Sequence, residues 1–374
     1  MEMKKYPCVY MRGGTSKAIV FHSKDLPEDP ALWDDLFLSA MGSPDLKQID
    51  GMGGAVSSTS KVAVVAPSRR PGIHVDYTFF QIGVNEASVA KNVNCGNISS
   101  CIGPFAIEEG LVRPQEPYTA VRIYNTNTGK VMEQRVRVER GQVAVYGDAR
   151  IAGVPGTGAE IRVSFLEPEG SVTGRLFPSG NRMDVFRIPG GRAVQGTLVD
   201  AGTAAVFVQA ENLGLKGTEL LELNEDKALL LKLEAIRGQA AVLCGLVQDW
   251  REAGSMNPAV PDIVLVGKPE QYSALHGEVV EREQMDLTAR CFCMGAMHRA
   301  FPVTTAIALC AAASAPGTAV SMVLEPGGLD GQAIRIGHVS GVLPIEIEAQ
   351  GGVLKSAACI RTARRIMEGI LYVR

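Results

Sequence analysis

The sequence predicts a two-domain protein of the α/β class, in which short and mainly antiparallel strands alternate with a few helices. The chain has 374 residues, about twice the length of a typical domain. Its β-rich runs are bounded by Gly, Pro, Asn and Asp, as strands and hairpins usually are. The pattern restarts after a turn-rich stretch at residues 168–190. We therefore expect domains at residues 1–185 and 186–374, and the last strand can return to the first domain.

Composition is typical of a soluble globular protein. Hydrophobic residues make up 46% of the chain and charged residues 21%. The formal net charge of -3 gives no general attraction to nucleic acid or to an anionic membrane. The first residues carry Lys4 and Lys5 but no apolar run of signal-peptide length behind them, so we expect a cytoplasmic protein. Small molecules are the expected partners.

Eight cysteines without a regular framework fit a reducing compartment, and we expect no disulfides. Cys291, Cys293 and His298 lie close together in the sequence, but they lack the second pair of ligands that a closed zinc site needs. The sequence therefore does not predict a metal site.

The first half predicts two helices among its strands. A helix is expected over residues 29–42, where an Asp-Pro start precedes apolar residues at helical spacing. Another follows Cys95, and Pro104 inside it removes a hydrogen bond and predicts a kink. The expected strands lie within residues 8–22, 60–67, 75–84, 120–147 and 159–168.

The second half predicts a long amphipathic helix within residues 224–247 and an apolar helix at 302–314. Residues 94–110 and 297–317 both place a small or polar stretch ahead of an apolar helix that ends in glycine. That spacing suggests a duplicated architecture. The expected strands lie within residues 195–210, 262–267, 318–326, 333–349 and 353–374.

Cys95 stands between Asn94 and Gly96 at an expected helix start. The unpaired backbone N–H groups there would favour the thiolate and make it a better nucleophile or proton carrier. Gly96 lets another group approach the backbone closely, and Asn97 is a favourable N-cap. Taken alone, the motif more often holds a cysteine that packs as a small hydrophobic side chain, a role that suits Cys101 better.

Lys61 follows a glycine- and serine-rich loop that ends at Ser60, and it opens an apolar strand. The loop is not a dinucleotide-binding fingerprint, because a strand and not a helix comes after it. A desolvated lysine at this position would hold its proton less firmly and can act as a general base. An exposed lysine at a strand edge is the more common case for an isolated motif.

Two further regions carry candidate anion-binding groups. In "MRGGTSK", residues 11–17, side chains and backbone amides can grip a carboxylate, although a plain hairpin turn explains the motif as well. In the second half, residues at a helix start can bind an anion or cap the helix, and "FPSGN", residues 177–181, can line a cleft or serve as a linker. Together with the segments around Lys61 and Cys95, these regions give the substrate-binding candidates Arg12, Gly14, Thr15, Ser16, Ser60, Asn94, Gly96, Asn97, Ser179, Asn181, His298, Arg299 and Thr304.

Seven motifs in order make the chain similar to the 2-methylaconitate isomerase (PrpF) family, which has the diaminopimelate epimerase-like fold. They are "MRGGTSK", "GSPDLKQIDGMGGAVSSTSKVAVV", "NCGNISSCIGPFAIEEGLV", "VRIYNTNT", "GVPGTGAEI", "FPSGN" and "MGAMHRAFPVT". The resemblance implies two similar domains, each with mainly antiparallel strands wrapped round a central helix, and an active site in the cleft between them. It implies that Lys61 and Cys95 are catalytic and that no metal or cofactor is used.

The implied reaction moves a C=C bond, or isomerises it cis–trans, in a small unsaturated acid such as methylaconitate, methylitaconate or 4-oxalomesaconate. Lys61 would remove an allylic proton, and Cys95 would return one to another carbon. Ser16, Ser60 and the amides near Gly96 would hold the dienolate, with Arg12 or Arg299 on the carboxylates.

Two alternatives stay open. Racemases and epimerases of the wider fold use two cysteines, whereas residues 298–304 contain none, although Cys293 lies near them in the sequence. A non-catalytic acid-binding protein would recognise the same ligands. The oligomeric state is not determined by the sequence, and a homodimer is compatible with it.

Overall fold

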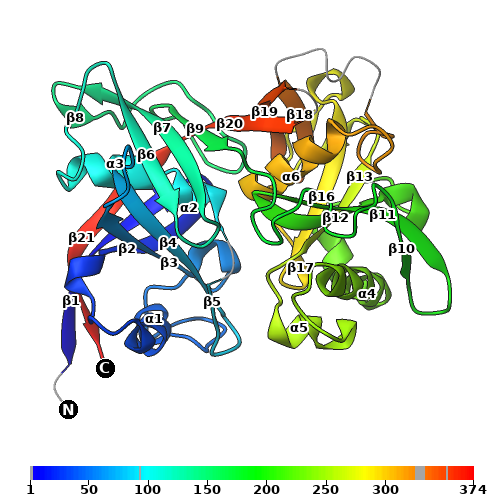
Figure 1. Ribbon diagram of the computed structural model, residues 1–374, viewed down its shortest axis with the longest axis horizontal. Coiled ribbons are helices and arrows are strands. Elements are labelled where there is room, and N and C mark those ends of the chain that lie inside the picture. Colours follow the sequence, from blue (N-terminus) through cyan, green and yellow to red (C-terminus); the bar gives the residue numbers. More distant parts are fainter. Residues whose placement is uncertain (1–2, 92–93, 325–332, 351–352) are drawn as a thin grey trace. The chain divides into compact units, whose positions relative to one another are not determined.

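The computed structural model describes residues 3–91, 94–324, 333–350 and 353–374, which form two compact units (Figure 1). Unit 1 comprises Met1–Ser164 and Ile360–Arg374, and unit 2 comprises Phe165–Cys359. The chain passes between the units within two strands, β9 (Ile161–Leu166) and β20 (Val353–Arg361). The turn-rich stretch at residues 168–190 therefore lies in unit 2.

Unit 1 is a mixed sheet in the order β21, β1, β2, β3, β4, β6, β7. Neighbours are antiparallel, except that β2 pairs with β3 and β4 with β6 in parallel. A helical connection precedes β3 and another precedes β6, as a parallel crossover requires. The strands are β1 (Lys4–Gly13), β2 (Ser16–His22), β3 (Lys61–Pro67), β4 (Val75–Ile82), β5 (Val89–Ala90), β6 (Tyr118–Asn125), β7 (Lys130–Glu139), β8 (Gln142–Val143) and β21 (Ala363–Val373).

Helix α1 (Trp33–Met41) covers one face of this sheet. Alternate residues of the strands, including Ile19, Phe21 and Phe80, form a core with the buried side of α1 that contains Phe37. The predicted helix at residues 29–42 is thus confirmed, with a 3₁₀ turn, Pro30–Leu32, in front of it.

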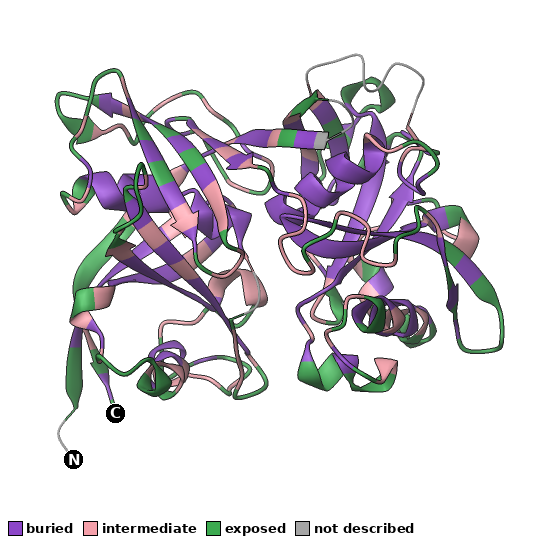
Figure 2. Ribbon diagram, in the orientation of Figure 1, coloured by how far each residue is buried: buried purple, intermediate pink, exposed green. Residues whose placement is uncertain are grey.

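The helical segment after Cys95 is divided into α2 (Gly96–Ser99) and α3 (Ile102–Glu108), which pack inside unit 1 (Figure 2). Every residue of α3 before Glu108 is buried, and α3 contacts β6, β7 and β8. Pro104 is the third residue of α3, in the first turn, where its missing N–H has no intrahelical partner to lose. In place of the kink predicted at Pro104, the helical segment is interrupted between Ser99 and Ile102, before the proline.

The strands of unit 2 pair in the order β10, β11, β12, β13, β16, β18, β19, β20, again with parallel and antiparallel neighbours. The parallel pairs are β12 with β13 and β16 with β18. Its strands are β10 (Asp184–Arg187), β11 (Ala193–Ala201), β12 (Thr203–Gln209), β13 (Asp262–Gly267), β16 (Leu287–Cys293), β17 (Ala296–Met297), β18 (Ala333–His338) and β19 (Gly341–Gln350), with β14 (Tyr272–Ser273) and β15 (Val279–Val280) forming a separate pair.

Two helices dominate unit 2. Helix α6 (Val303–Ala313) is buried along its whole length and packs against β11, β12 and β19 (Figure 2). Helix α4 (Lys227–Leu243) packs on β10, β12 and β13, with Leu233 and Ile236 in the core. A short helix, α5 (Ala253–Met256), follows it. Further 3₁₀ segments lie in unit 1 at Ser23–Asp25 and Ser57–Thr59. Those of unit 2 are Ala210–Leu213, Leu221–Glu225, Trp250–Glu252 and Arg282–Gln284.

The two units repeat one topology. The series β1, β2, β3, β4, β6, β7 and the series β11, β12, β13, β16, β18, β19 have the same pairing directions in the same order. Helix α1 corresponds to α4, and the pair α2 and α3 corresponds to α6. The duplicated architecture and the predicted fold of two similar domains are confirmed.

One predicted strand is absent. Residues 318–324 form hydrogen-bonded turns, in which the amide of Met322 donates to the carbonyl of Thr318 at 3.2 Å. The Thr318 hydroxyl donates to Ala312 O at 2.7 Å and ties the turn to the end of α6. Residues 325 and 326 of the predicted strand lie outside the described residues.

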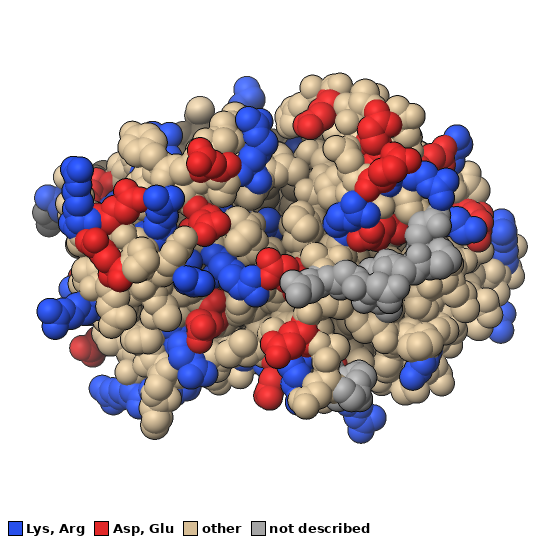
Figure 3. Space-filling view, turned by 90° about the horizontal axis from the view of Figure 1, so that it is seen from above, with Lys and Arg blue, Asp and Glu red and all other residues tan. Residues whose placement is uncertain are grey.

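Basic and acidic side chains are interspersed on the face shown in Figure 3, so that face presents no extended surface of one sign. Within the described part of the chain, no helix is both long and apolar enough to span a membrane.

Candidate active site

Lys61 opens β3 and is buried, with 7% of its surface exposed. It pairs in register with Gln81 on β4, and its Nζ donates a hydrogen bond to Gln81 Oε1. The same Nζ lies 5.1 Å from the centroid of the Phe79 ring. An exposed position at a strand edge is thus excluded for Lys61.

The loop ahead of Lys61 is anchored by a second buried glutamine. Gln48 Nε2 donates to the hydroxyl of Ser60 at 2.7 Å, and Gln48 Oε1 accepts from the amide of Ala55 at 2.9 Å. A Cβ at Gly53 would lie 2.2 Å from Gln48 Oε1, so a larger residue there would displace the Gln48 side chain. Ser60 is fully buried as a result, next to Lys61.

Cys95 is the N-cap of α2. The amide of Ile98 donates to Cys95 Sγ at 3.5 Å, and the amide of Ser99 donates to Cys95 O at 2.8 Å. Asn97, predicted as the N-cap, is instead the second residue of α2. Because α2 is a single turn, the thiol is influenced by this nearby N–H and not by the dipole of a long helix.

Cys101 has the packing role that the sequence suggested. It is fully buried, and its Sγ donates to Ile98 O at 3.1 Å. Burial raises the pKa of the Cys101 thiol, and the neighbouring Cys95 adds to that shift. Cys101 is therefore a neutral thiol within the core at physiological pH.

Three alternate side chains of β4 bring Lys61 and Cys95 onto one face of the sheet. Gln81 and Phe79 contact Lys61, as described above. Tyr77 lies beside Cys95 and Cys101: burial raises the pKa of Tyr77 well above its ordinary value, and both cysteines add to the shift. Because residues two apart on a strand share a face, Lys61 and the start of α2 lie on the same side of β4.

The motif at residues 11–17 forms the β1–β2 hairpin turn and lies against α2. Gly14 has φ +52, and a Cβ there would lie 2.2 Å from Asn97 Oδ1. The amide of Thr15 donates to the same Oδ1 at 3.4 Å. The hydroxyl of Thr15 is buried without a hydrogen-bond partner among the described residues, and Ser16 is buried beside it. The Thr15 hydroxyl is therefore a hydrogen-bond donor that no described residue uses.

Arg12 supports this turn from β1. Its Nη1 donates to Gly14 O and to Thr362 O, each at 2.9 Å. Burial lowers the pKa of Arg12 from its ordinary value, although Cys101 opposes that shift. Nη1 of Arg12 is thus used in hydrogen bonds to backbone carbonyls at the hairpin turn and at Thr362.

Two asparagines to which the sequence analysis gave no role, Asn125 and Asn127, connect these groups with Asn94, a predicted site residue. Asn125 Nδ2 donates to Asn94 Oδ1 at 2.7 Å, immediately before Cys95. Asn125 Oδ1 accepts from the amide of Asn127, whose side chain forms two hydrogen bonds of 2.8 Å with the backbone of Phe79. The sequence signal for Asn125 and Asn127 was the "NTNT" stretch, residues 125–128, which belongs to one of the family motifs.

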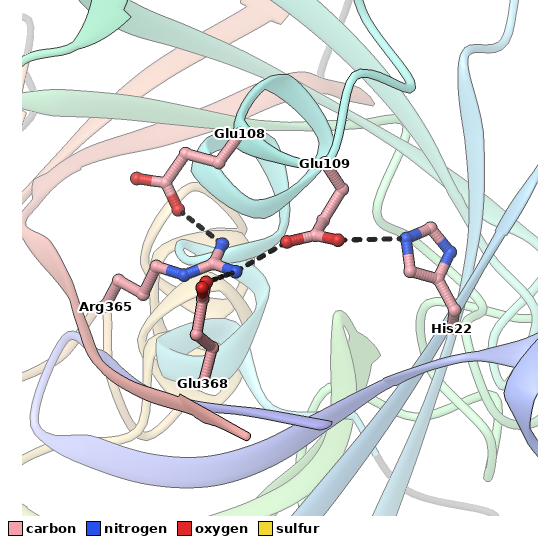
Figure 4. A network of polar contacts seen from close by, with 5 residues as sticks. All are labelled: His22, Glu108, Glu109, Arg365 and Glu368. Atoms are coloured by element: carbon pink, nitrogen blue, oxygen red, sulfur yellow. Dashed lines mark hydrogen bonds and ion pairs between the residues drawn. The ribbon is translucent and has the colours of Figure 1, made fainter. Parts of the chain in front are cut away.

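An ionic network holds the end of α3 (Figure 4). Arg365 on β21 donates to Glu108 at 3.0 Å and to Glu109 and Glu368 at 2.6 Å each. The other oxygen of Glu109 lies 3.4 Å from Nε2 of His22 on β2. The network ties α3 to both strands and so fixes the helical segment that Cys95 begins.

The predicted site residues of the second half all lie in unit 2. Ser179 Oγ and Asn181 Nδ2 both donate to the carboxylate of Asp184, at 2.8 and 3.1 Å. In the structure these two side chains therefore shape the loop before β10.

The start of α6 carries the remaining candidates. His298 Nδ1 accepts from the amide of Ala300 at 3.1 Å, Arg299 is exposed, and Thr304 is buried in the first turn. The N-cap of α6 is Pro302, so the position that corresponds to Cys95 carries no thiol. Among the residues described, no group of three or more His, Cys, Asp or Glu side chains is placed to hold a metal ion.

Sequence comparison gives matches over the full length of the chain. A relative from Eubacterium barkeri named 3-methylitaconate isomerase is 42% identical over all of this chain and 98% of its own length. A 2-methyl-aconitate isomerase from Shewanella oneidensis is 39% identical over 99% of this chain and 97% of its own. A (4E)-oxalomesaconate Delta-isomerase from a Novosphingobium species is 40% identical over 99% and 98%, respectively.

Structural comparison agrees. The crystal structure of a methylitaconate-delta-isomerase superposes with a TM-score of 0.83 at 42% identity, covering all of this chain and 96% of the other. A hydroxyproline epimerase shares the fold, with a TM-score of 0.59 at 12% identity. The model of the family described as PrpF protein matches residues 3–374. The chain therefore belongs to the PrpF protein family.

Proposed function

We propose that this chain is an isomerase that moves a C=C bond in a small unsaturated di- or tricarboxylic acid, with Lys61 as base and Cys95 as proton donor. Relatives named as methylitaconate, methylaconitate and oxalomesaconate isomerases are about 40% identical to it over nearly its whole length, which supports the isomerase class. The acid itself is expected to be one of these compounds or a close analogue.

The observation that carries the assignment of residues is the environment of Lys61. A buried ammonium is costly unless it is paired, yet Nζ has an amide and an aromatic ring as its contacts among the described residues. Such a site tolerates the neutral amine, which is the form that a general base needs. Cys95, at the start of α2 on the same side of β4, supplies a second group able to exchange protons.

The chemistry balances without a further reactant. Lys61 Nζ takes a proton from the allylic carbon, and the electron pair of that C–H bond delocalises into the conjugated carboxylate or keto group as a dienolate. Cys95 Sγ gives its proton to the far carbon of the allylic system, and the double bond moves. The Lys61 ammonium and the Cys95 thiolate then return to their starting forms by proton exchange through solvent.

The β1–β2 turn provides donors for the negative charge that develops. The unpartnered hydroxyl of Thr15 and the buried hydroxyl of Ser16 lie at the turn that packs against Asn97. Preorganised donors of this kind stabilise an enolate without the cost of reorganisation. We assign contacts with the substrate to this turn and to Ser60, Asn94 and Gly96, and in unit 2 to Ser179, Asn181, His298, Arg299 and Thr304.

We also propose a cytoplasmic location, and a homodimer as the state to test first. The eight free cysteines fit a reducing compartment. Size-exclusion chromatography with light scattering measures the mass directly, and a mass near 39.8 kDa would contradict the dimer.

The test of function is proton NMR in D₂O with methylaconitate, methylitaconate, oxalomesaconate and diaminopimelate. We expect a shifted double bond with deuterium at an allylic carbon for one of the three unsaturated acids. Lys61→Ala should abolish both changes, and Cys95→Ala should slow the rate by a factor on the order of 100 or more. Lys5→Ala is the matched control, because Lys5 also lies over an aromatic ring, that of Tyr372, at 5.5 Å.

The other outcomes separate the alternatives. Exchange confined to the α-carbon of diaminopimelate would replace the isomerase with an amino-acid epimerase. Binding without exchange in any compound would leave a binding protein. Full activity in Lys61→Ala would remove Lys61 from the mechanism even if the isomerase were established.

A further inference from the structure

The polar partner of the buried Lys61 is an amide and not a carboxylate. Nζ donates to Gln81 Oε1, and within the described ranges it forms no ion pair with a carboxylate. An amide oxygen accepts from an ammonium and from a neutral amine alike, whereas a carboxylate would bind the charged form much more strongly. The contact with Gln81 therefore persists when Lys61 gives up its proton.

The side chain of Gln81 is locked in one orientation. Its Nε2 lies 3.0 Å from Ser60 O, 3.1 Å from Ser57 O and 3.3 Å from Ile82 O. Turning the amide over would point Oε1 at three carbonyl oxygens and point the NH₂ group at the Lys61 amine. Because Gln81 is buried, with 6% of its surface exposed, water cannot compensate for those contacts. Only Oε1 can face Lys61.

The fixed orientation of Gln81 limits the directions from which the Lys61 amine can accept a proton. The nitrogen has four tetrahedral directions, of which Cε occupies one and the hydrogen bond to Gln81 a second. An N–H is favoured toward the electron-rich face of Phe79, whose centroid is 5.1 Å from Nζ. The lone pair of the neutral amine then has one direction left.

We propose that Gln81 is a positioning residue that aims the lone pair of Lys61 and keeps its amine hydrogen-bonded in both protonation states. The inference rests on the proposed role of Lys61 as the base. Gln81 acts through Lys61 and does not itself touch the substrate.

The first test is Gln81→Met, which keeps the length of the side chain but removes both the acceptor and the donor. Misplacing a catalytic group by about 1 Å can cost 100-fold in rate, so we expect kcat to fall by a factor on the order of 100 while KM changes little. A folded Gln81→Met enzyme with the wild-type kcat would overturn the proposal.

The second test is Gln81→Glu, which places a carboxylate against the Lys61 ammonium. The neutral amine should then form only at higher pH, so the rising limb of the rate against pH should move upward by about 1 unit or more. Gln239→Glu is the matched control, because Gln239 Nε2 also donates to backbone carbonyls, those of Arg187 and Ala235, each at 2.7 Å. We expect the control to keep the wild-type profile, and an unmoved profile in folded Gln81→Glu would contradict the proposal.

A third measurement does not depend on activity. Lysine labelled with ¹³C at Cε reports the titration of Lys61 by NMR, with the resonance assigned from Lys61→Arg. Gln81→Glu should move that titration to higher pH even if no acid on the panel is a substrate, which separates this inference from the proposed function. Thermal unfolding by circular dichroism checks each variant. If either one fails to fold, Gln81→Asn, which withdraws Oε1 by one methylene, takes its place with the same expected loss of kcat.

Discussion

At the scale of single residues, position decides what two cysteines of the same short segment can do. Cys95 caps a single helical turn and receives an N–H from Ile98, whereas Cys101 is fully buried and donates its S–H to a carbonyl. A thiol can take part in proton transfer only if it exchanges protons with substrate or solvent. The two cysteines, six residues apart, therefore separate the thiol that we propose for proton transfer from a thiol that packs in the core.

Cys101→Ala should accordingly leave kcat within a factor of about 3 of the wild type, while lowering stability by about 1–2 kcal/mol for the lost volume and hydrogen bond. Cys95→Ala should do the reverse, with a large loss of kcat and a small change in stability. Steady-state kinetics and urea unfolding on both variants measure the contrast. Equal losses of kcat would show that the segment tolerates no change and that position does not separate the roles.

Gly14 gives a second prediction at this scale. Gly14→Ala would strain a backbone at φ +52 and place a Cβ 2.2 Å from Asn97 Oδ1, beside the start of α2. Gly72→Ala is the matched control, because φ is +72 there and nothing lies within 4 Å of the added Cβ. We expect about 1 kcal/mol of destabilisation and full activity from Gly72→Ala.

The clash in Gly14→Ala should cost more stability than that and should also lower kcat, because it moves the turn against α2. Urea unfolding and initial rates compare the two variants. Equal effects on stability and activity would mean that strain alone, and not the contact with Asn97, requires glycine at residue 14.

At the scale of elements, Arg365 joins α3 to β21 through carboxylates in different environments (Figure 4). Burial raises the pKa of Glu108 from its ordinary value, although its hydrogen bond to Arg365 opposes the shift. For Arg365, burial acts to lower the pKa, but hydrogen bonds to Glu109, Glu108 and Glu368 raise it overall. The arginine therefore stays charged, and the raised pKa of Glu108 makes the stability of the network depend on pH.

A carboxyl whose pKa is higher in the folded state stabilises the fold below its unfolded pKa, and that contribution is lost as pH rises through the folded pKa. The wild type should thus gain stability relative to Glu108→Gln as the pH falls from neutral to below the ordinary glutamate pKa of about 4.3. Urea midpoints at several pH values measure the difference. Glu368→Gln is the control, because it removes a partner of the same arginine whose side chain is 71% exposed. A Glu108→Gln difference that stays constant with pH would contradict the argument.

Most elements could be predicted from the sequence because local patterns determine them, and the exceptions have local reasons too. Apolar spacing predicted α1, α4 and α6. The strand predicted from the apolar residues at 318–324 is wrong, because hydrogen bonds to the end of α6 and within the segment hold it in turns. Gln81 could not be recognised as a partner of Lys61, because strand register and not sequence spacing joins residues 20 positions apart.

At the scale of the whole molecule, duplication explains why the chain crosses between units twice. After β7 the chain runs through β9 into unit 2, and after β19 it runs through β20 back into unit 1. Strand β10 then pairs with β11, and β21 pairs with β1, at equivalent sheet edges. Unit 2 is thus one continuous segment, whereas unit 1 is built from two.

This difference predicts how fragments of the chain behave. Residues 165–359 contain a complete core around α4 and β10–β13 and should unfold cooperatively on their own. Residues 1–164 lack β21, which pairs with β1 along its whole length and brings the buried Val373 to the core beside Tyr6. That fragment alone should expose apolar surface and aggregate, because burial of such side chains is the main source of stability.

Appending residues 360–374 through a glycine-rich linker should restore a soluble, cooperative fold to residues 1–164. Thermal unfolding by circular dichroism and binding of a hydrophobic dye compare the fragments, and a linker fused to the same fifteen residues in scrambled order is the control. If residues 1–164 fold alone, β21 is only an accessory to unit 1. If the appended strand restores the fold and the scrambled one does not, the returning strand β21 is part of the folding unit of unit 1.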